Sequence, residues 1–182
     1  HNADQILPTI EAARKMLSKC HNIPTQMQIN YDIANGYHDY RFITKSRDLQ
    51  YLEKEIYHLR KVLDLYESAY CDDEEAEESN EISVAKYIAM RSYTNLGNAM
   101  HRLGRYIAAI DYFQAALLIS KDFAMASLNL SFSLLNYTLK TNQNVLYVPQ
   151  KHKWKGRFIM MKKRISLLTI CMVICSVIAG CT

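Results

Sequence analysis

The sequence predicts an all-α protein, and three observations support that prediction. Glycine and proline are scarce, with 5 Gly and 3 Pro among 182 residues, so few positions interrupt regular structure. Apolar residues recur at steps of three and four over much of the first 139 residues, which is the spacing of helices buried on one face. Part of the pattern also repeats, since Leu130 lies 34 residues after Leu96. We therefore expect antiparallel helix pairs that stack into a short superhelical array, followed by a hydrophobic helix in the C-terminal part.

The first three expected helices cover residues 4–20, 25–40 and 46–70. Pro8 and Pro24 fit near the starts of the first two, where a missing backbone N–H is tolerated. The third helix either packs into the array or offers a heptad-like seam to a partner helix. Its apolar stripe consists of Leu49, Leu52, Ile56, Leu59, Leu63 and Tyr66, with Glu53, Lys54, Arg60 and Lys61 on the solvated side.

An acidic run at residues 71–81 then separates this helix from the next. We expect a solvated linker, the alternative being a patch for a basic partner or a divalent cation. The run lacks the glycine and the alternating ligands of a calcium loop.

The clearest unit occupies residues 90–120, within helices expected at 82–103 and 106–120. Gly104 is placed to end the first of these helices, because glycine adopts a left-handed backbone without penalty. Asp122 is placed to cap a further helix at 123–139. That helix is a half unit, since residues 140–157 form a polar, basic linker with Pro149 inside it.

Residues 93–118 resemble one tetratricopeptide (TPR) helix pair. That pattern has a large residue, a Leu-Gly pair, an aromatic and a later Ala-x3-aromatic. These places hold Tyr93, Leu96-Gly97, Met100 and Ala109-x3-Phe113, so Met100 stands where the pattern has an aromatic. Residues 30–40, NYDIANGYHDY, align as a degenerate first helix, with Ala34 and Asn35 in the places of Gly97 and Asn98. In the later half unit Ser131 replaces the glycine. The resemblance implies a non-catalytic scaffold over residues 1–139 that binds a protein or an extended peptide.

The candidate peptide-binding residues are Asn98, Asn129, Asn95 and Arg102. Asn98 and Asn129 resemble the asparagines with which chaperone-binding TPR proteins hold the carboxylate and backbone of a ligand peptide, and an amide both donates and accepts. Thr94 stands where that subfamily carries a lysine. The alternative is that both asparagines stabilise helix packing.

Residues 25–139 also resemble the N-terminal TPR part of bacterial proteins that carry a C-terminal HEPN-type ribonuclease domain. That resemblance implies a rival function, the scaffold of an RNA-cleaving protein whose nuclease domain is absent. Arg14 and His21 match the Arg-x4–6-His spacing of such nucleases but precede the repeats, so we interpret the pair as chance. The sequence contains no Gly-rich phosphate loop, G-x-S-x-G or HExxH motif, so we expect no catalytic residues, cofactor or metal.

The C-terminal part differs in charge and in composition. Residues 1–122 hold 14 Lys/Arg and 18 Asp/Glu, a balance of −4, whereas residues 123–182 hold 8 Lys/Arg and no acid, a balance of +8. Residues 158–182 are hydrophobic after a basic start and resemble a bacterial lipoprotein signal peptide that ends in Ile-Ala-Gly-Cys, which makes Cys181 a lipidation candidate.

Three interpretations of this segment stay open. It is a junction with another reading frame, a membrane anchor through residues 158–180 that would make the chain a membrane-attached TPR adaptor, or an apolar helix that packs on the array. The cysteine spacing favours a reduced, cytoplasmic location for the helical part.

Overall fold

The computed structural model describes residues 3–70 and 79–141, and within these ranges the chain is all helical. The described elements are α1 (Ala3–Leu17), α2 (Ile23–Thr44), α3 (Leu49–Tyr70), α4 (Asn80–Arg102), α5 (Tyr106–Ile119) and α6 (Ala124–Thr141). No strand occurs in the part of the chain that the structure describes. The all-α prediction is therefore confirmed.

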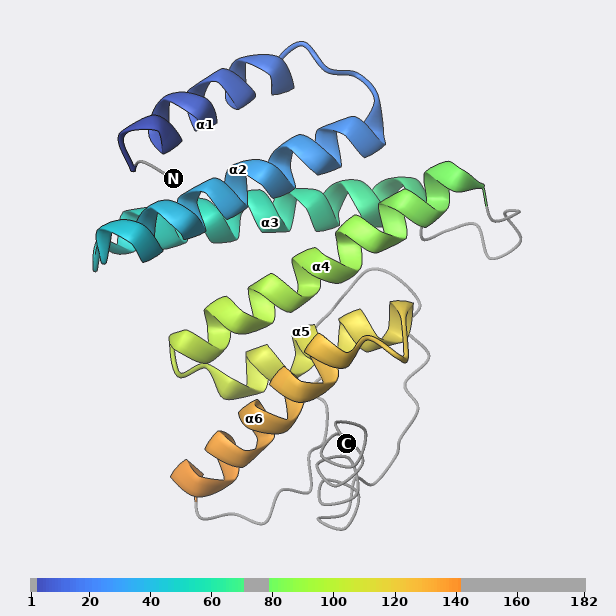
Figure 1. Cartoon of the computed structure of the whole chain (residues 1–182). Helices are drawn as coiled ribbons and strands as arrows, with labels where there is room; N and C mark the ends of the chain where they lie inside the picture. Colours follow the sequence, from blue (N-terminus) through green and yellow to red (C-terminus); the bar gives the residue numbers. More distant parts are fainter. Residues whose placement is uncertain (1–2, 71–78, 142–182) are drawn as a thin grey trace, which may run out of the picture.

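Consecutive helices pack against each other and run in opposite directions, as Figure 1 shows. Two further contacts join helices that are not consecutive, because α2 also packs on α4 and α4 also packs on α6. The even-numbered helices thus form a row of direct neighbours. Side chains on this row come together although they lie far apart in the sequence.

Local sequence signals set several helix ends. Asn22 caps α2, since its side-chain oxygen accepts a hydrogen bond from the Thr25 backbone N–H at 2.9 Å, and Pro24 lies in the first turn. Ser79 caps α4 in the same way through the Ile82 backbone N–H at 3.2 Å. Gly104 follows α4 with a φ of 72°, as expected of a residue that ends a helix in the left-handed region.

Some predicted boundaries were wrong by a few residues. α1 begins at Ala3, so Pro8 lies inside the helix rather than at its entry, and the helix ends at Leu17. α3 begins at Leu49 rather than at residue 46, and Leu49 is 61% exposed instead of belonging to the buried stripe. α6 begins at Ala124, so Phe123 and not Asp122 immediately precedes it, and the helix continues through Lys140 and Thr141 of the expected linker.

A continuous apolar core runs between α2, α3 and α4 and reaches α5 and α6. It forms because each helix turns its three-and-four-spaced apolar residues inward, which removes them from water. Its most deeply buried large side chains are Met27, Leu59, Val62 and Leu96. Smaller clusters join α1 to α2 around Ile10 and Tyr37, and α4 to α5 and α6 around Met100 and Phe113.

Gly97 allows α5 to approach α4 closely. A Cβ atom at Gly97 would lie 2.5 Å from Cε1 of Phe113, far closer than two carbon atoms can approach without repulsion. Phe113 is fully buried and belongs to the cluster that joins α4, α5 and α6. The Leu-Gly of the repeat pattern thus has a packing reason in this chain.

Several predictions fall on residues outside the described ranges. They are most of the acidic run at 71–81, the basic linker from residue 142 onward, the hydrophobic segment 158–182 and the lipidation candidate Cys181. Among the residues that the structure describes, none of the helices has the length and apolar character needed to cross a bilayer.

The packing of Gly97 gives a first prediction. We expect Gly97→Ala to lower the free energy of unfolding by about 1–3 kcal/mol, because the added methyl group overlaps the Phe113 ring. Gly36→Ala is the comparison variant, since its Cβ would lie 2.9 Å from Cγ1 of the buried Ile10, a less severe overlap than at Gly97, and we expect a smaller loss. Urea unfolding of both variants measures the difference. Equal free energies of unfolding in the two variants would contradict the inference that Gly97 allows the close approach of α5 to α4.

Candidate functional site

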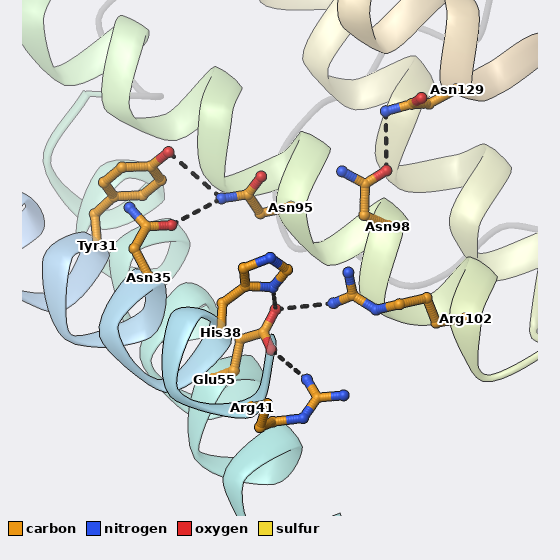
Figure 2. Close-up of polar contacts among 9 residues, drawn as sticks. All are labelled: Tyr31, Asn35, His38, Arg41, Glu55, Asn95, Asn98, Arg102 and Asn129. Carbon is orange, nitrogen blue, oxygen red and sulfur yellow. Dashed lines mark hydrogen bonds and ion pairs between the residues drawn. The ribbon is translucent and has the colours of Figure 1, made fainter. Parts of the chain in front are cut away.

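Side-chain amides connect α4 to α6 and α4 to α2, as Figure 2 shows. Asn129 of α6 donates a hydrogen bond through Nδ2 to Oδ1 of Asn98 in α4, at 2.9 Å. Asn95, one turn earlier in α4, donates through Nδ2 to Oδ1 of Asn35 in α2 at 3.2 Å, and to the Tyr31 hydroxyl at 3.4 Å. Three of the four predicted binding residues therefore lie in two bridges between neighbouring even-numbered helices.

The two bridges occupy equivalent positions. The sequence alignment matches Asn35 with Asn98, and these two residues are the acceptors. It also matches Asn95 with Asn129, and these two residues are the donors. The same contact therefore occurs twice along the row of even-numbered helices, once at each junction.

Each bridge uses only part of the hydrogen-bonding capacity of its amides. A side-chain amide has two N–H donors on nitrogen and two lone pairs on oxygen. Within the described residues, no hydrogen bond involves Nδ2 of Asn98 or Oδ1 of Asn129, and both side chains are only partly buried. The α4–α6 bridge thus leaves one amide donor and one amide acceptor without a hydrogen bond to the described residues.

A buried carboxylate joins α2, α3 and α4 beside these bridges (Figure 2). The Glu55 side chain in α3 is only 3% exposed. Its oxygens accept hydrogen bonds from Nη1 of Arg41 in α2 at 2.6 Å and from Nη2 of Arg102 in α4 at 3.0 Å. Nδ1 of His38 in α2 lies 3.4 Å from the same carboxylate.

These neighbours keep Glu55 ionised. Burial alone raises the pKa of this carboxyl group. The hydrogen bond from His38 and the charges of Arg102 and Arg41 outweigh burial, and the pKa of Glu55 is lowered from its ordinary value. Two arginines against one carboxylate give the cluster an excess of positive charge.

Arg102, the fourth predicted binding residue, is therefore partly neutralised. Its guanidinium is bound to Glu55, although its side chain remains 40% exposed. His38 is similarly placed, with 42% of its side chain exposed. Both side chains therefore keep exposed surface while they contact Glu55.

Sequence reasoning missed Glu55, Arg41 and His38. One signal was present, because Glu55 lies three residues after Leu52 and four before Leu59, on the apolar side of its helix. An acidic residue at such a position requires partners, since an unpaired buried charge is costly. The sequence did not indicate which cations supply them.

Two histidines have structural partners. Nδ1 of His101 in α4 lies 2.7 Å from Oγ of Ser133 in α6, but Ser133 is completely buried, so a substrate could not reach its hydroxyl. Nδ1 of His58 in α3 lies 2.9 Å from Oδ1 of the buried Asn30 in α2. Among residues 3–70 and 79–141, no group of His, Cys, Asp and Glu is arranged to hold a metal ion.

Comparison with known proteins adds no assignment, because no family model, curated protein or solved structure matches this chain.

The Glu55 cluster gives a prediction about stability. We expect Glu55→Gln to lower the free energy of unfolding by about 2–4 kcal/mol, because two partly buried guanidinium groups lose their counter-charge. Glu53→Gln, an exposed position in the same helix, is the matched control. Urea unfolding at neutral pH measures both variants. A loss of less than about 0.5 kcal/mol for Glu55→Gln would show that the cluster is not a major stabilising contact.

His58 gives a prediction about pH. Burial, helped by the charge of Arg14, lowers the pKa of His58 from its ordinary value of 6.5 to about 4. The unfolded chain therefore binds a proton at this residue between these pH values while the folded chain does not. The contribution of His58 to stability is complete above the ordinary pKa and decreases as the pH falls toward 4.

We expect His58→Gln to reduce this loss of stability by roughly 2 kcal/mol, since glutamine does not titrate and keeps an amide near Asn30. Urea unfolding between about pH 7 and pH 5 measures it. His21→Gln, in the exposed α1–α2 turn, is the control. His101 adds a smaller effect of the same sign, because burial followed by the charge of Arg102 lowers its pKa. An identical pH dependence in His58→Gln and the parent protein would contradict the prediction.

Proposed function

We propose that residues 3–141 form a TPR-type scaffold that binds a protein or an extended peptide along the face shared by α2, α4 and α6. The observation that carries the proposal is the twice-repeated amide bridge, Asn35–Asn95 and Asn98–Asn129. A contact that recurs at matched positions is what stacked helix pairs of one repeat family produce. The proposed role is binding rather than catalysis.

The packing of the helices supports the TPR assignment. α2 and α4 are the first helices of two pairs and α6 begins a third, and these first helices contact one another in addition to their own partners. Gly97 and Phe113 provide the close approach within the clearest pair. In arrays of this kind, the first helices line the extended concave surface that binds ligands.

The chemistry of the bridges favours a peptide as the ligand. The donor of Asn98 and the acceptor of Asn129 complement the C=O and N–H of a peptide backbone in an extended conformation. The excess positive charge of Arg41 and Arg102 over Glu55 favours a ligand with an acidic side chain or a terminal carboxylate. Partner selection would then depend on amide hydrogen bonds together with charge.

A displayed library of acidic and neutral peptides, selected on the full chain, tests the proposal. The selected peptide is then synthesised with a fluorescent label, and its affinity is measured by anisotropy. We expect Asn98→Ala to weaken binding about tenfold, because one hydrogen bond to the peptide and the orientation of Asn129 are lost.

Asn136→Ala is the matched control, since this asparagine lies in α6, as the bridge partner Asn129 does, but bonds to the backbone of its own helix at Phe132. A thermal melt of each variant separates lost binding from lost folding. Unchanged affinity in Asn98→Ala would exclude the asparagine role. Cleavage of RNA by the purified chain, abolished by a substitution within it, would replace the binding function by a catalytic one.

A further inference from the structure

α6 carries a row of exposed large apolar residues. Their exposed fractions range from 44% for Leu128 to 70% for Leu139. The steps between them alternate between three and four residues, which places all of them on one side of the helix. This row, called the α6 stripe below, consists of Met125, Leu128, Phe132, Leu135 and Leu139.

The stripe lies on the side of α6 opposite its contacts with the other helices. Ala126 and Ser133 are fully buried, Ser133 bonds to His101 of α4, and Leu130 packs on the cluster around Met100 and Phe113. At 100° per residue, these three positions centre on roughly the opposite side of the helix from the stripe. Nothing in the described part of the chain covers the stripe.

Such a stripe has the pattern of a helix–helix seam. Alternating steps of three and four are the spacing at which one helix packs along another. From Met125 to Leu139 the seam is about 21 Å long at 1.5 Å per residue. A single exposed leucine is ordinary on a protein surface, but five large apolar residues in a row mark an interaction site.

We propose that residues 165–178 of the same chain pack as a helix along the α6 stripe. This run, ISLLTICMVICSVI, contains no charged residue. As a helix its 14 residues would be about 20 Å long, which matches the length of the stripe. The contact would remove two apolar surfaces from water together, which is the main driving force for such packing.

The intervening chain allows the contact. Residues 142–164 would be long enough as a tether for the run to return along α6, since an extended chain covers about 3.3 Å or more per residue. In an antiparallel arrangement, Lys162, Lys163 and Arg164 would lie near the C-terminal end of α6, where helix carbonyl groups favour positive charge. A tethered segment also acts at high effective concentration, which favours it over a separate chain.

Cross-linking in the full chain tests the proposal. Cys171 and Cys175 lie four residues apart, so in the proposed helix they would share one side. Leu128→Cys and Leu135→Cys are prepared separately, and each protein is treated with a short bis-maleimide at low protein concentration. Peptide mass spectrometry identifies the linked pairs. Glu53→Cys, exposed on α3, is the control.

We expect links within one chain between an introduced α6 cysteine and Cys171 or Cys175, with a yield about tenfold above that of the control. A yield equal to that of the control at both stripe positions would overturn the proposal. Links found only between two chains would overturn it as well, in favour of a second copy on the stripe.

Alkylation of the native cysteines gives an independent measurement. We expect Phe132→Asp to accelerate alkylation of Cys171 and Cys175 about tenfold, because a charge in the seam opposes burial of the run. Phe42→Asp, on the exposed end of α2, should leave the rate unchanged. Equal rates in Phe132→Asp and the parent protein would overturn the contact. If Cys171 and Cys175 are protected from alkylation only when phosphatidylglycerol vesicles are added, the run prefers a membrane to α6 and the proposal is overturned. Neither measurement depends on peptide binding, so this proposal and the proposed function succeed or fail separately.

Discussion

The ion pairs of Glu55 fix three helices against one another. A carboxylate that is 3% exposed is stable only if cations replace the water it has lost, and Arg41 and Arg102 provide them from the last turns of α2 and α4. These contacts join α2 and α4 through α3, so they limit how far the two even-numbered helices can move apart. The amide bridge between Asn35 and Asn95 needs that same short separation. The face that carries the asparagine bridges therefore depends on the buried charge of Glu55.

The asparagine bridges serve packing, and in the proposed function they also serve recognition. The two roles are compatible because an amide has more hydrogen-bonding groups than one bridge uses. The bridge between Asn98 and Asn129 orients both side chains, which reduces the entropy that a ligand must overcome to bind them. In the proposed function, the two alternatives from the sequence, packing and peptide binding, are two parts of one arrangement.

α6 is the last of the even-numbered helices within residues 3–70 and 79–141, and there the surface changes in character. α2 and α4 each pack between neighbours, whereas α6 has α4 and α5 on one side and exposed apolar residues on the other. Stacked repeats need a terminal element that covers the last apolar face, because that face is otherwise exposed to water. The proposed packing of residues 165–178 would provide such a cover from the same chain.

The sequence by itself determined the helices, their order and many of their ends. Periodic apolar residues, Pro24, Gly104 and the Leu-Gly of the clearest unit act within a few positions along the chain, so they can be interpreted without a fold. Exceptions such as Leu49 occur where a periodic residue falls at the end of a helix, beyond the reach of the core.

Only the tertiary structure decided which polar groups meet. Arg102 and Glu55 are 47 residues apart, and Asn95 and Asn35 are 60 apart. Residue type shows that a buried carboxylate or amide needs a partner. The identity of that partner depends on which helix faces are brought together, and the packing of α2, α4 and α6 determines this.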